Sequence, residues 1–152
     1  MAELERRPIA VTMDGDGIAV CVVQVAGQFL VSGGDMPANT IEGSDPYAMW
    51  LAPGRRLVVA NTAPDGSFVS DVSDGIVVIE FSGAQMENIL AMGCPLDPGT
   101  LVSGRCAQTL FAGVRVVLYR HGNAVRLHVE RSLAQWLLDW LRQAVTSFET
   151  GG

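Results

Sequence analysis

The side chains of this sequence that could do chemistry are two histidines, three cysteines and a set of scattered carboxylates. His121 is expected in a hairpin turn, and His128 falls at an alternating polar position of the strand that follows. No cysteine or carboxylate accompanies them at the spacing of a zinc site, so we interpret them as a solvated pair. Cys94 and Cys106 lack a CxxC arrangement, and we interpret both as free buried thiols.

The aspartates and the glycine-rich stretches form no catalytic pattern either. The aspartates considered lie in turns and at strand ends, where this side chain usually bonds its own backbone: Asp65, Asp71, Asp74 and Asp97. Neither GDGIAV nor SGGDM has the GxGxxG spacing that binds a dinucleotide between a strand and a helix. There is no GxSxG, and all ten basic residues are arginine, which excludes lysine Schiff-base chemistry. We therefore predict no catalytic, cofactor-binding or metal-binding residue in this chain.

The composition favours a protein that meets a partner. Of the 152 residues, 17% are charged, against roughly 25% in a typical soluble domain, and 49% are hydrophobic. With so few charges to cover the surface, some apolar area is expected to contact another protein. The net charge of −6 disfavours nucleic acids and anionic membranes as partners.

The cysteines and the apolar runs bear on where the protein resides. Three cysteines without paired spacing argue against a disulfide framework and fit a reducing compartment. The longest apolar run, residues 18–27, is too short to span a membrane and follows aspartates rather than the positive charge of a secretion signal. We expect a cytoplasmic protein.

Apolar, β-branched runs separated by glycine and proline turns predict most of the secondary structure. The expected strands are residues 18–25, 48–51, 57–60, 76–81, 106–111, 114–120 and 125–129, the first of them buried. Residues 32–46 are rich in Gly, Pro, Asn, Asp and Ser and predict a long surface loop. One helix is expected at about residues 83–92, with Ser82 as its N-cap. A longer helix is expected from an N-cap at Ser132 to residue 148.

The carboxy-terminal helix is more apolar than one buried face requires. Its core stripe lies within about 80° of arc and contains Leu133, Leu137, Trp140, Ala144 and Phe148. Further apolar residues widen the arc to about 200°: Trp136, Leu138, Leu141 and Val145. Trp136 and Leu138 lie on opposite flanks of the stripe and are the candidate interface residues. Either the amino-terminal part of the chain or another protein must cover the flanks.

Three short motifs resemble the folate-binding aminomethyltransferases of glycine cleavage: Asp71-Val72-Ser73, Ser82-Gly83 and the stretch GRCAQT at residues 104–109. In those enzymes the following strand leads into an Asn-rich turn and a helix that carries the catalytic aspartate. Here the turn reads Glu130-Arg131-Ser132 and, counting back from Trp140, the aspartate position holds Leu137. The resemblance implies a related fold without the residue for one-carbon transfer.

A fuller resemblance is to the gamma subunits of heterotetrameric sarcosine oxidases. It covers roughly residues 48–144 and rests on the segments AMWLAPGRRLVV, GCPLD, CAQTL and VERSLAQWLLDWL. In that family the gamma subunit is small, binds no flavin and associates with the large alpha subunit. The beta subunit of that family carries the flavins and the amine-oxidising site.

The resemblance implies an α+β fold in which an antiparallel or mixed sheet is covered by two helices, like the amino-terminal region of the aminomethyltransferases. We expect one domain over residues 1–152, with a strand and a long loop at about 1–47 and the core unit at about 48–148. The implied role is that of a non-catalytic gamma subunit that contacts mainly the alpha subunit, in a complex with beta and delta subunits. FAD, FMN, NAD and tetrahydrofolate are then expected on those other subunits. An independent folate-binding or aminomethyltransferase-like protein, and an adaptor of another flavoprotein complex, remain alternatives.

Overall fold

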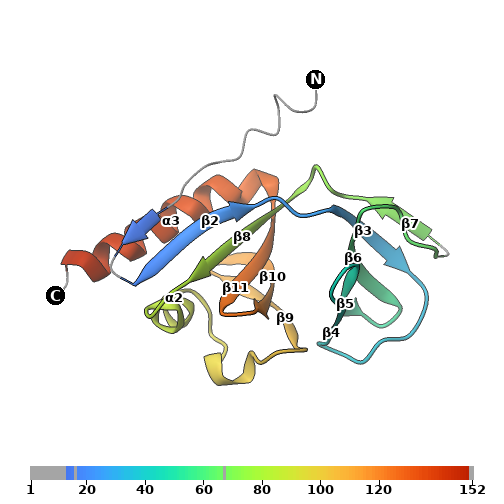
Figure 1. Ribbon diagram of the computed structural model, residues 1–152, viewed down its shortest axis with the longest axis horizontal. Helices are drawn as coiled ribbons and strands as arrows, with labels where there is room; N and C mark the ends of the chain where they lie inside the picture. Colours follow the sequence, from blue (N-terminus) through green and yellow to red (C-terminus); the bar gives the residue numbers. More distant parts are fainter. Residues whose placement is uncertain (1–12, 16, 67, 151–152) are drawn as a thin grey trace.

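The computed structural model describes residues 13–15, 17–66 and 68–150, which form two antiparallel sheets and two α-helices (Figure 1). The amino-terminal half contains β1 Met13–Gly15, β2 Ile18–Val23, β3 Gly27–Ser32, β4 Ile41–Gly43, β5 Tyr47–Ala52, β6 Arg55–Ala60 and β7 Phe68–Asp71. The remainder contains β8 Ile76–Ser82, α2 Met86–Gly93, a short 3-10 helix η1 Pro98–Thr100, β9 Cys106–Phe111, β10 Val114–His121, β11 Ala124–Glu130 and α3 Arg131–Thr150.

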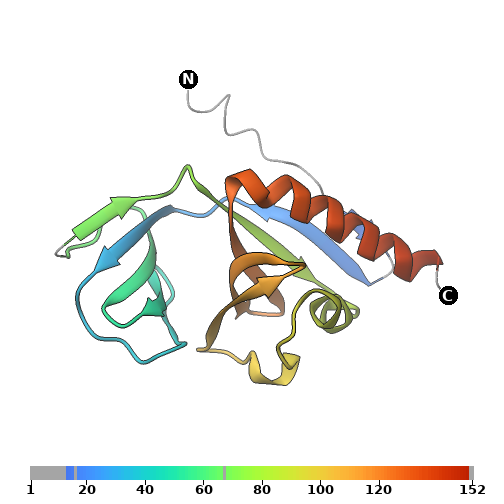
Figure 2. The same ribbon diagram turned by 180° about the vertical axis from the view of Figure 1, so that it is seen from behind.

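The strands divide into a six-stranded sheet, ordered β1-β2-β8-β11-β10-β9, and a five-stranded sheet, ordered β4-β5-β6-β3-β7. Every strand pairing in the described residues is antiparallel. The two sheets lie next to each other along the long axis of the molecule, and the chain crosses between them from β2 to β3 and from β7 to β8 (Figures 1 and 2). The predicted α+β class is therefore confirmed, with two sheets in place of the single sheet expected.

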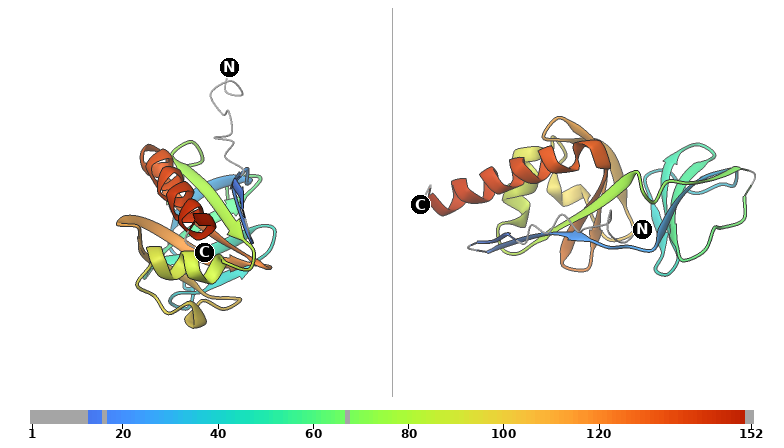
Figure 3. Two further views of the ribbon diagram at one scale, coloured as in Figure 1. Left: turned by 90° about the vertical axis from the view of Figure 1, so that its left-hand side faces the viewer. Right: turned by 90° about the horizontal axis from the view of Figure 1, so that it is seen from above.

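The two helices cover one face of the six-stranded sheet only. Figure 3 shows α3 running along this sheet, away from the five-stranded sheet. Its buried side chains pack with α2 and the sheet around fully buried residues such as Phe81, Phe111 and Leu118. The opposite face of the six-stranded sheet meets the five-stranded sheet, where Tyr119 and Cys106 pack against Met49 and neighbouring residues. The junction of the two sheets is thus built into the core of the protein.

Several elements differ from the sequence predictions. The predicted loop at residues 32–46 contains β4, and β3 and β7 were not expected at all. The strand predicted at residues 18–25 ends at Val23 and is buried on one side only, with Ile18 and Val20 covered while Ala19 is exposed. An apolar run in the sequence therefore forms a strand that is covered on one side only.

Both helices begin elsewhere than predicted. Helix α2 starts at Met86 with Gln85 at its N-cap, because Ser82 is still the last residue of β8. Gly83 cannot carry a side chain there, since a Cβ would lie 2.0 Å from the carbonyl oxygen of Gly17. Helix α3 starts at Arg131, directly after β11, so Ser132 lies inside the helix rather than capping it.

Candidate functional site

The Asp71-Val72-Ser73 motif forms a turn that connects the two sheets. The Asp71 carboxylate accepts hydrogen bonds from the backbone N–H of Ser73 at 3.0 Å and from its hydroxyl at 2.6 Å. The Ser73 Oγ in turn accepts a hydrogen bond from the backbone N–H of Gln28 in β3, at 2.9 Å. The motif therefore holds the crossing from β7 to β8 against the five-stranded sheet, and both of its polar side chains are engaged in that task.

The second motif, residues 104–109, joins the sheets at their other contact. The carbonyl oxygen of Gly104 accepts a hydrogen bond from the N–H of Ile41 at 3.1 Å, and Cys106 N–H donates to Asn39 at 2.9 Å. The Gln108 side-chain amide also donates to the carbonyl oxygen of Leu51 in β5. Two of the three motifs on which the predicted resemblance to the aminomethyltransferases rests thus serve here as inter-sheet connections.

A continuous chain of hydrogen bonds runs through the buried junction between the sheets. Tyr47 in β5 and Tyr119 in β10 share a hydrogen bond of 2.9 Å between their hydroxyl groups. The Tyr119 hydroxyl lies 2.9 Å from Nε2 of His128, and Nδ1 of His128 lies 2.7 Å from Oε1 of Gln28. Gln28 completes the chain by donating from Nε2 to the carbonyl oxygen of Ile76 at 3.1 Å.

The hydrogen-bond directions in this chain follow from its Gln28 end. Because the Gln28 amide nitrogen donates to a carbonyl oxygen, its Oε1 faces His128 and must accept a hydrogen bond from Nδ1–H. Burial lowers the pKa of His128 to about 3, with a smaller contribution from the positive charge of Arg126, so the imidazole is neutral. Its Nε2 therefore accepts a hydrogen bond from Tyr119, whose own pKa is raised mainly by burial.

This geometry corrects the prediction that the histidines are a solvated pair. His121 is exposed at the end of β10, but His128 is only 3% exposed and both of its ring nitrogens are engaged. A base needs a free nitrogen within reach of a substrate, and His128 offers none. The alternating pattern of β11 gave the correct face for His128, but not the second sheet that covers that face.

The cysteines are free, as predicted. Cys94 and Cys106 are buried, and Cys21 is partly exposed. Burial raises the pKa of the Cys106 thiol to about 11, and burial followed by the negative charge of Glu80 raises that of Cys21. Both thiols are thus held in the protonated form, which is a poor nucleophile and a poor metal ligand.

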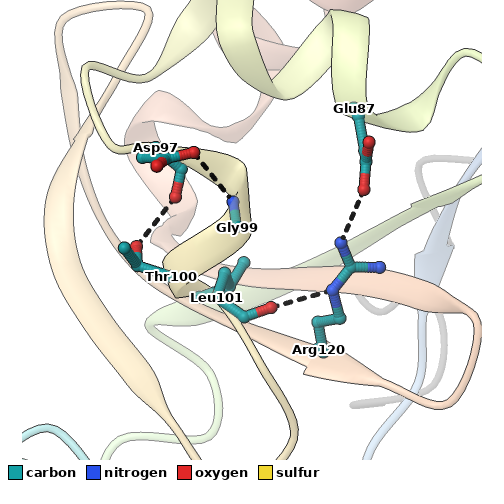
Figure 4. Close-up of polar contacts among 6 residues, drawn as sticks. All are labelled: Glu87, Asp97, Gly99, Thr100, Leu101 and Arg120. Atoms are coloured by element: carbon teal, nitrogen blue, oxygen red, sulfur yellow. Dashed lines mark hydrogen bonds and ion pairs between the residues drawn. The ribbon is translucent and has the colours of Figure 1, made fainter.

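The aspartate Asp97 also serves the fold. Its carboxylate accepts the backbone N–H of Gly99 at 3.0 Å, and its carbonyl oxygen accepts the hydroxyl of Thr100 at 2.8 Å (Figure 4). Beside this turn, Arg120 of β10 donates to the carbonyl oxygen of Leu101 and pairs with Glu87 of α2 at 3.1 Å. These contacts fasten α2 and η1 to the sheet.

Two depressions lie beside the junction of the sheets. A polar cleft of about 290 Å³ is lined by Asp71 and Ser73 of the Asp71-Val72-Ser73 turn (the DxS motif), together with Asn61 and Arg131. An apolar groove of about 640 Å³ lies between Leu30, Leu51 and Leu57 of the five-stranded sheet and Leu110 and Val117 of the other. Hereafter the latter is called the inter-sheet groove.

The two candidate interface residues of α3 differ in burial. Leu138 is fully buried and belongs to the internal core, together with Leu137, so Leu138 does not face a partner. Trp136 is 52% exposed, and Leu133, which was predicted in the core stripe, is 38% exposed. At 100° per residue these two lie about 60° apart and form one exposed apolar flank of α3, whereas Trp140 is partly buried and packs edge-on against Phe111 of the core. The Phe148 side chain of the predicted stripe lies outside the described residues.

Over residues 13–15, 17–66 and 68–150, no three His, Cys, Asp or Glu side chains are grouped so as to hold a metal ion. In the same part of the chain, no helix has the length and apolar character needed to cross a membrane.

Comparisons with known proteins agree with this architecture. The model of the family described as sarcosine oxidase, gamma subunit family, matches residues 15–147. Among solved structures, a chain of the heterotetrameric sarcosine oxidase from Corynebacterium sp. U-96, in complex with pyrrole 2-carboxylate, superposes with a TM-score of 0.78. The two are 19% identical over 90% of this chain and 88% of that chain, so this likeness shows a common fold. No curated protein matches the chain at a significant level.

Proposed function

Because the chain belongs to the sarcosine oxidase gamma subunit family, we propose that it is the non-catalytic gamma subunit of a heterotetrameric sarcosine oxidase. The complex oxidatively demethylates sarcosine or a related N-methyl amino acid and passes the methyl group to tetrahydrofolate. In this proposal the chain stabilises the alpha subunit, its main contact, and the beta and delta subunits complete the cytoplasmic assembly. FAD, FMN, NAD and tetrahydrofolate are carried by the other subunits. The observation that carries the proposal is the family match over residues 15–147.

The use of the polar residues supports a non-catalytic role. Leu137 stands where the related aminomethyltransferases have their catalytic aspartate, and it is fully buried in the core. The DxS motif is committed to a turn, and both ring nitrogens of His128 are bonded inside the sheet junction. These groups are engaged in hydrogen bonds or packing contacts that stabilise the fold.

The exposed flank of α3 is the part of this surface that we assign to subunit contact. Aromatic side chains are enriched at the centres of protein interfaces, and Trp136 presents half of its surface on a helix otherwise anchored in the core. A flank made of Leu133 and Trp136 fits a partner that covers α3 from the side away from the sheet.

Co-expression with the alpha, beta and delta subunits tests the proposed function. With a purification tag on the alpha subunit, we expect this chain to co-purify in equal amount with the flavin-bearing subunits. Omitting it should lower the yield and the melting temperature of the alpha subunit. If the other subunits assemble and melt identically without it, and do not retain it when it is present, the proposal is wrong. Titrating the isolated chain with tetrahydrofolate addresses the folate-protein alternative, for which saturable binding would be required.

A further inference from the structure

The outer edge of β9 carries backbone groups that its own sheet does not use. β9 is the last strand of the six-stranded sheet and joins β10 through the turn at Ala112 and Gly113. These two residues have φ of 51° and 83°, as in a two-residue type I′ hairpin, whose flanking residues exchange hydrogen bonds. Because pairs in an antiparallel ladder alternate, the N–H and C=O groups of Leu110 and Gln108 point away from β10.

The two ends of this edge confirm the alternation and are themselves covered. At one end the N–H of Cys106 donates outward to the carbonyl oxygen of Asn39 at 2.9 Å. At the other end the N–H of Ala112 donates to the carbonyl oxygen of Gly93 at 2.7 Å. Between these ends, the outward backbone groups of Gln108 and Leu110 form no backbone hydrogen bond within the described part of the chain. Both residues are exposed, so this short stretch is an open strand edge.

The open edge borders the inter-sheet groove. The side chains of Gln108 and Leu110 line the groove, and the Leu110 side chain is 49% exposed. A strand that paired with β9 would direct every second side chain into the groove, because side chains alternate between the two faces of a sheet. The leucines on the opposite wall suit apolar side chains at those positions.

The charges near the groove favour a different protein over a second copy of this chain. Arg115 lines the groove and Arg105 precedes β9; both are exposed, and neither forms an ion pair with another described residue. Pairing two copies through β9 would bring the same arginines to both sides of one edge, where like charges repel. An acidic side chain on the incoming strand would instead pair with Arg115.

We propose that the β9 edge and the inter-sheet groove accept a short extended segment of a partner subunit, with alternating apolar residues and an acidic residue that reaches Arg115. This rests on the proposed function, because it assumes that the chain works inside a complex. It adds a second contact, distinct from the flank of α3, and assigns it a definite mode, the addition of a strand to a sheet edge.

A matched pair of variants tests this pairing. Gln108→Pro removes the outward N–H and the side-chain bond to Leu51, whereas Gln108→Ala removes only the side-chain bond. Proline is tolerated on edge strands where its nitrogen faces outward, so both variants should fold. We expect Gln108→Pro to raise the Kd for the purified alpha–beta–delta assembly by about tenfold or more relative to Gln108→Ala.

Amide hydrogen exchange on the unmodified chain gives an independent readout. In the isolated chain the amides of Gln108 and Leu110 should exchange quickly, while those of Ala107 and Thr109, which bond to β10, should be protected. In the assembled complex all four should be protected. If the complex forms but Gln108→Pro binds as well as Gln108→Ala, or the amides at 108 and 110 still exchange quickly, strand addition is wrong and the proposed function stands. If the wild-type chain does not bind the other subunits, both proposals fail.

Discussion

His128 shows how a residue that resembles a functional group serves the fold. Its position in β11 places it on the face of the six-stranded sheet that the five-stranded sheet covers, between Tyr119 and Gln28. The burial that removes water also lowers its pKa to about 3, and the two hydrogen bonds fix its neutral tautomer. A buried polar group that has all its partners positions the two sheets relative to each other, because any other arrangement leaves it unpaired.

This burial makes the stability of the protein sensitive to acid. The pKa of His128 is lowered in the folded state from 6.5 to about 3, so below pH 6.5 the unfolded chain takes up a proton that the folded chain cannot. The stabilisation is complete above pH 6.5 and is lost as the pH falls from 6.5 toward 3. Between pH 7 and pH 5 the free energy of unfolding should fall by about 2 kcal/mol through this residue.

Urea unfolding at pH 7, 6 and 5 measures that slope. His121 is exposed, but burial and then the positive charge of Arg126 lower its pKa too, so His121→Asn should remove only its own contribution to the slope and leave that of His128. The ring protons of His128 should also show no titration by NMR above pH 5. A free energy of unfolding that is flat across this range would mean that His128 is accessible to protons in the folded state.

At the scale of elements, α3 divides its apolar residues between the core and the surface. Its buried side chains span about 120° of arc and comprise Ala134, Leu137, Leu138, Leu141, Ala144 and Val145. One sheet face with α2 covers that arc, so the helix needs no second cover on the Leu138 side. The opposite flank, with Leu133 and Trp136, remains open.

Alanine variants of α3 should therefore separate stability from assembly. Leu137→Ala and Leu138→Ala should each lower the free energy of unfolding by about 2–5 kcal/mol, because both side chains are fully buried and leave a cavity. Trp136→Ala should change it by less than about 1 kcal/mol but weaken binding to the other subunits by about 2 kcal/mol or more. Thermal melts of the isolated variants and co-purification of the complex measure the two effects. A Trp136→Ala variant that unfolds as easily as Leu137→Ala would place this side chain in the core.

The sequence was most informative where a local pattern decides the outcome. The hairpin of β10 and β11, the strands β5, β6, β8 and β9 and the long carboxy-terminal helix followed from alternation and turn residues. The second sheet could not be predicted in this way, because β3 and β7 are short strands whose pairing depends on residues far along the chain. The packing of this second sheet against the first also buries His128. The orientation of α3 about its own axis determines that Leu138 is buried while Leu133 is exposed.

At the scale of the whole molecule, the protein combines a well-buried core with exposed apolar residues and an open strand edge at β9. The turn at residues 71–73 and the stretch at residues 104–109 connect the two sheets. The low charge leaves several large apolar side chains on the surface: Phe68, Met92, Val102, Leu110, Leu133 and Trp136. Two of these mark the flank of α3 and one marks the β9 edge. These surfaces are consistent with the proposed role, in which the chain acts through the subunits that it contacts.

Native mass spectrometry of the assembly, purified through a tag on this chain from the cells that produce it, tests that claim most directly. We predict a complex that contains one copy of this chain with alpha, beta and delta subunits, bears flavin and oxidises sarcosine or a related N-methyl amino acid. Recovery of this chain alone, or with proteins that carry no flavin and oxidise no such amine, would contradict it.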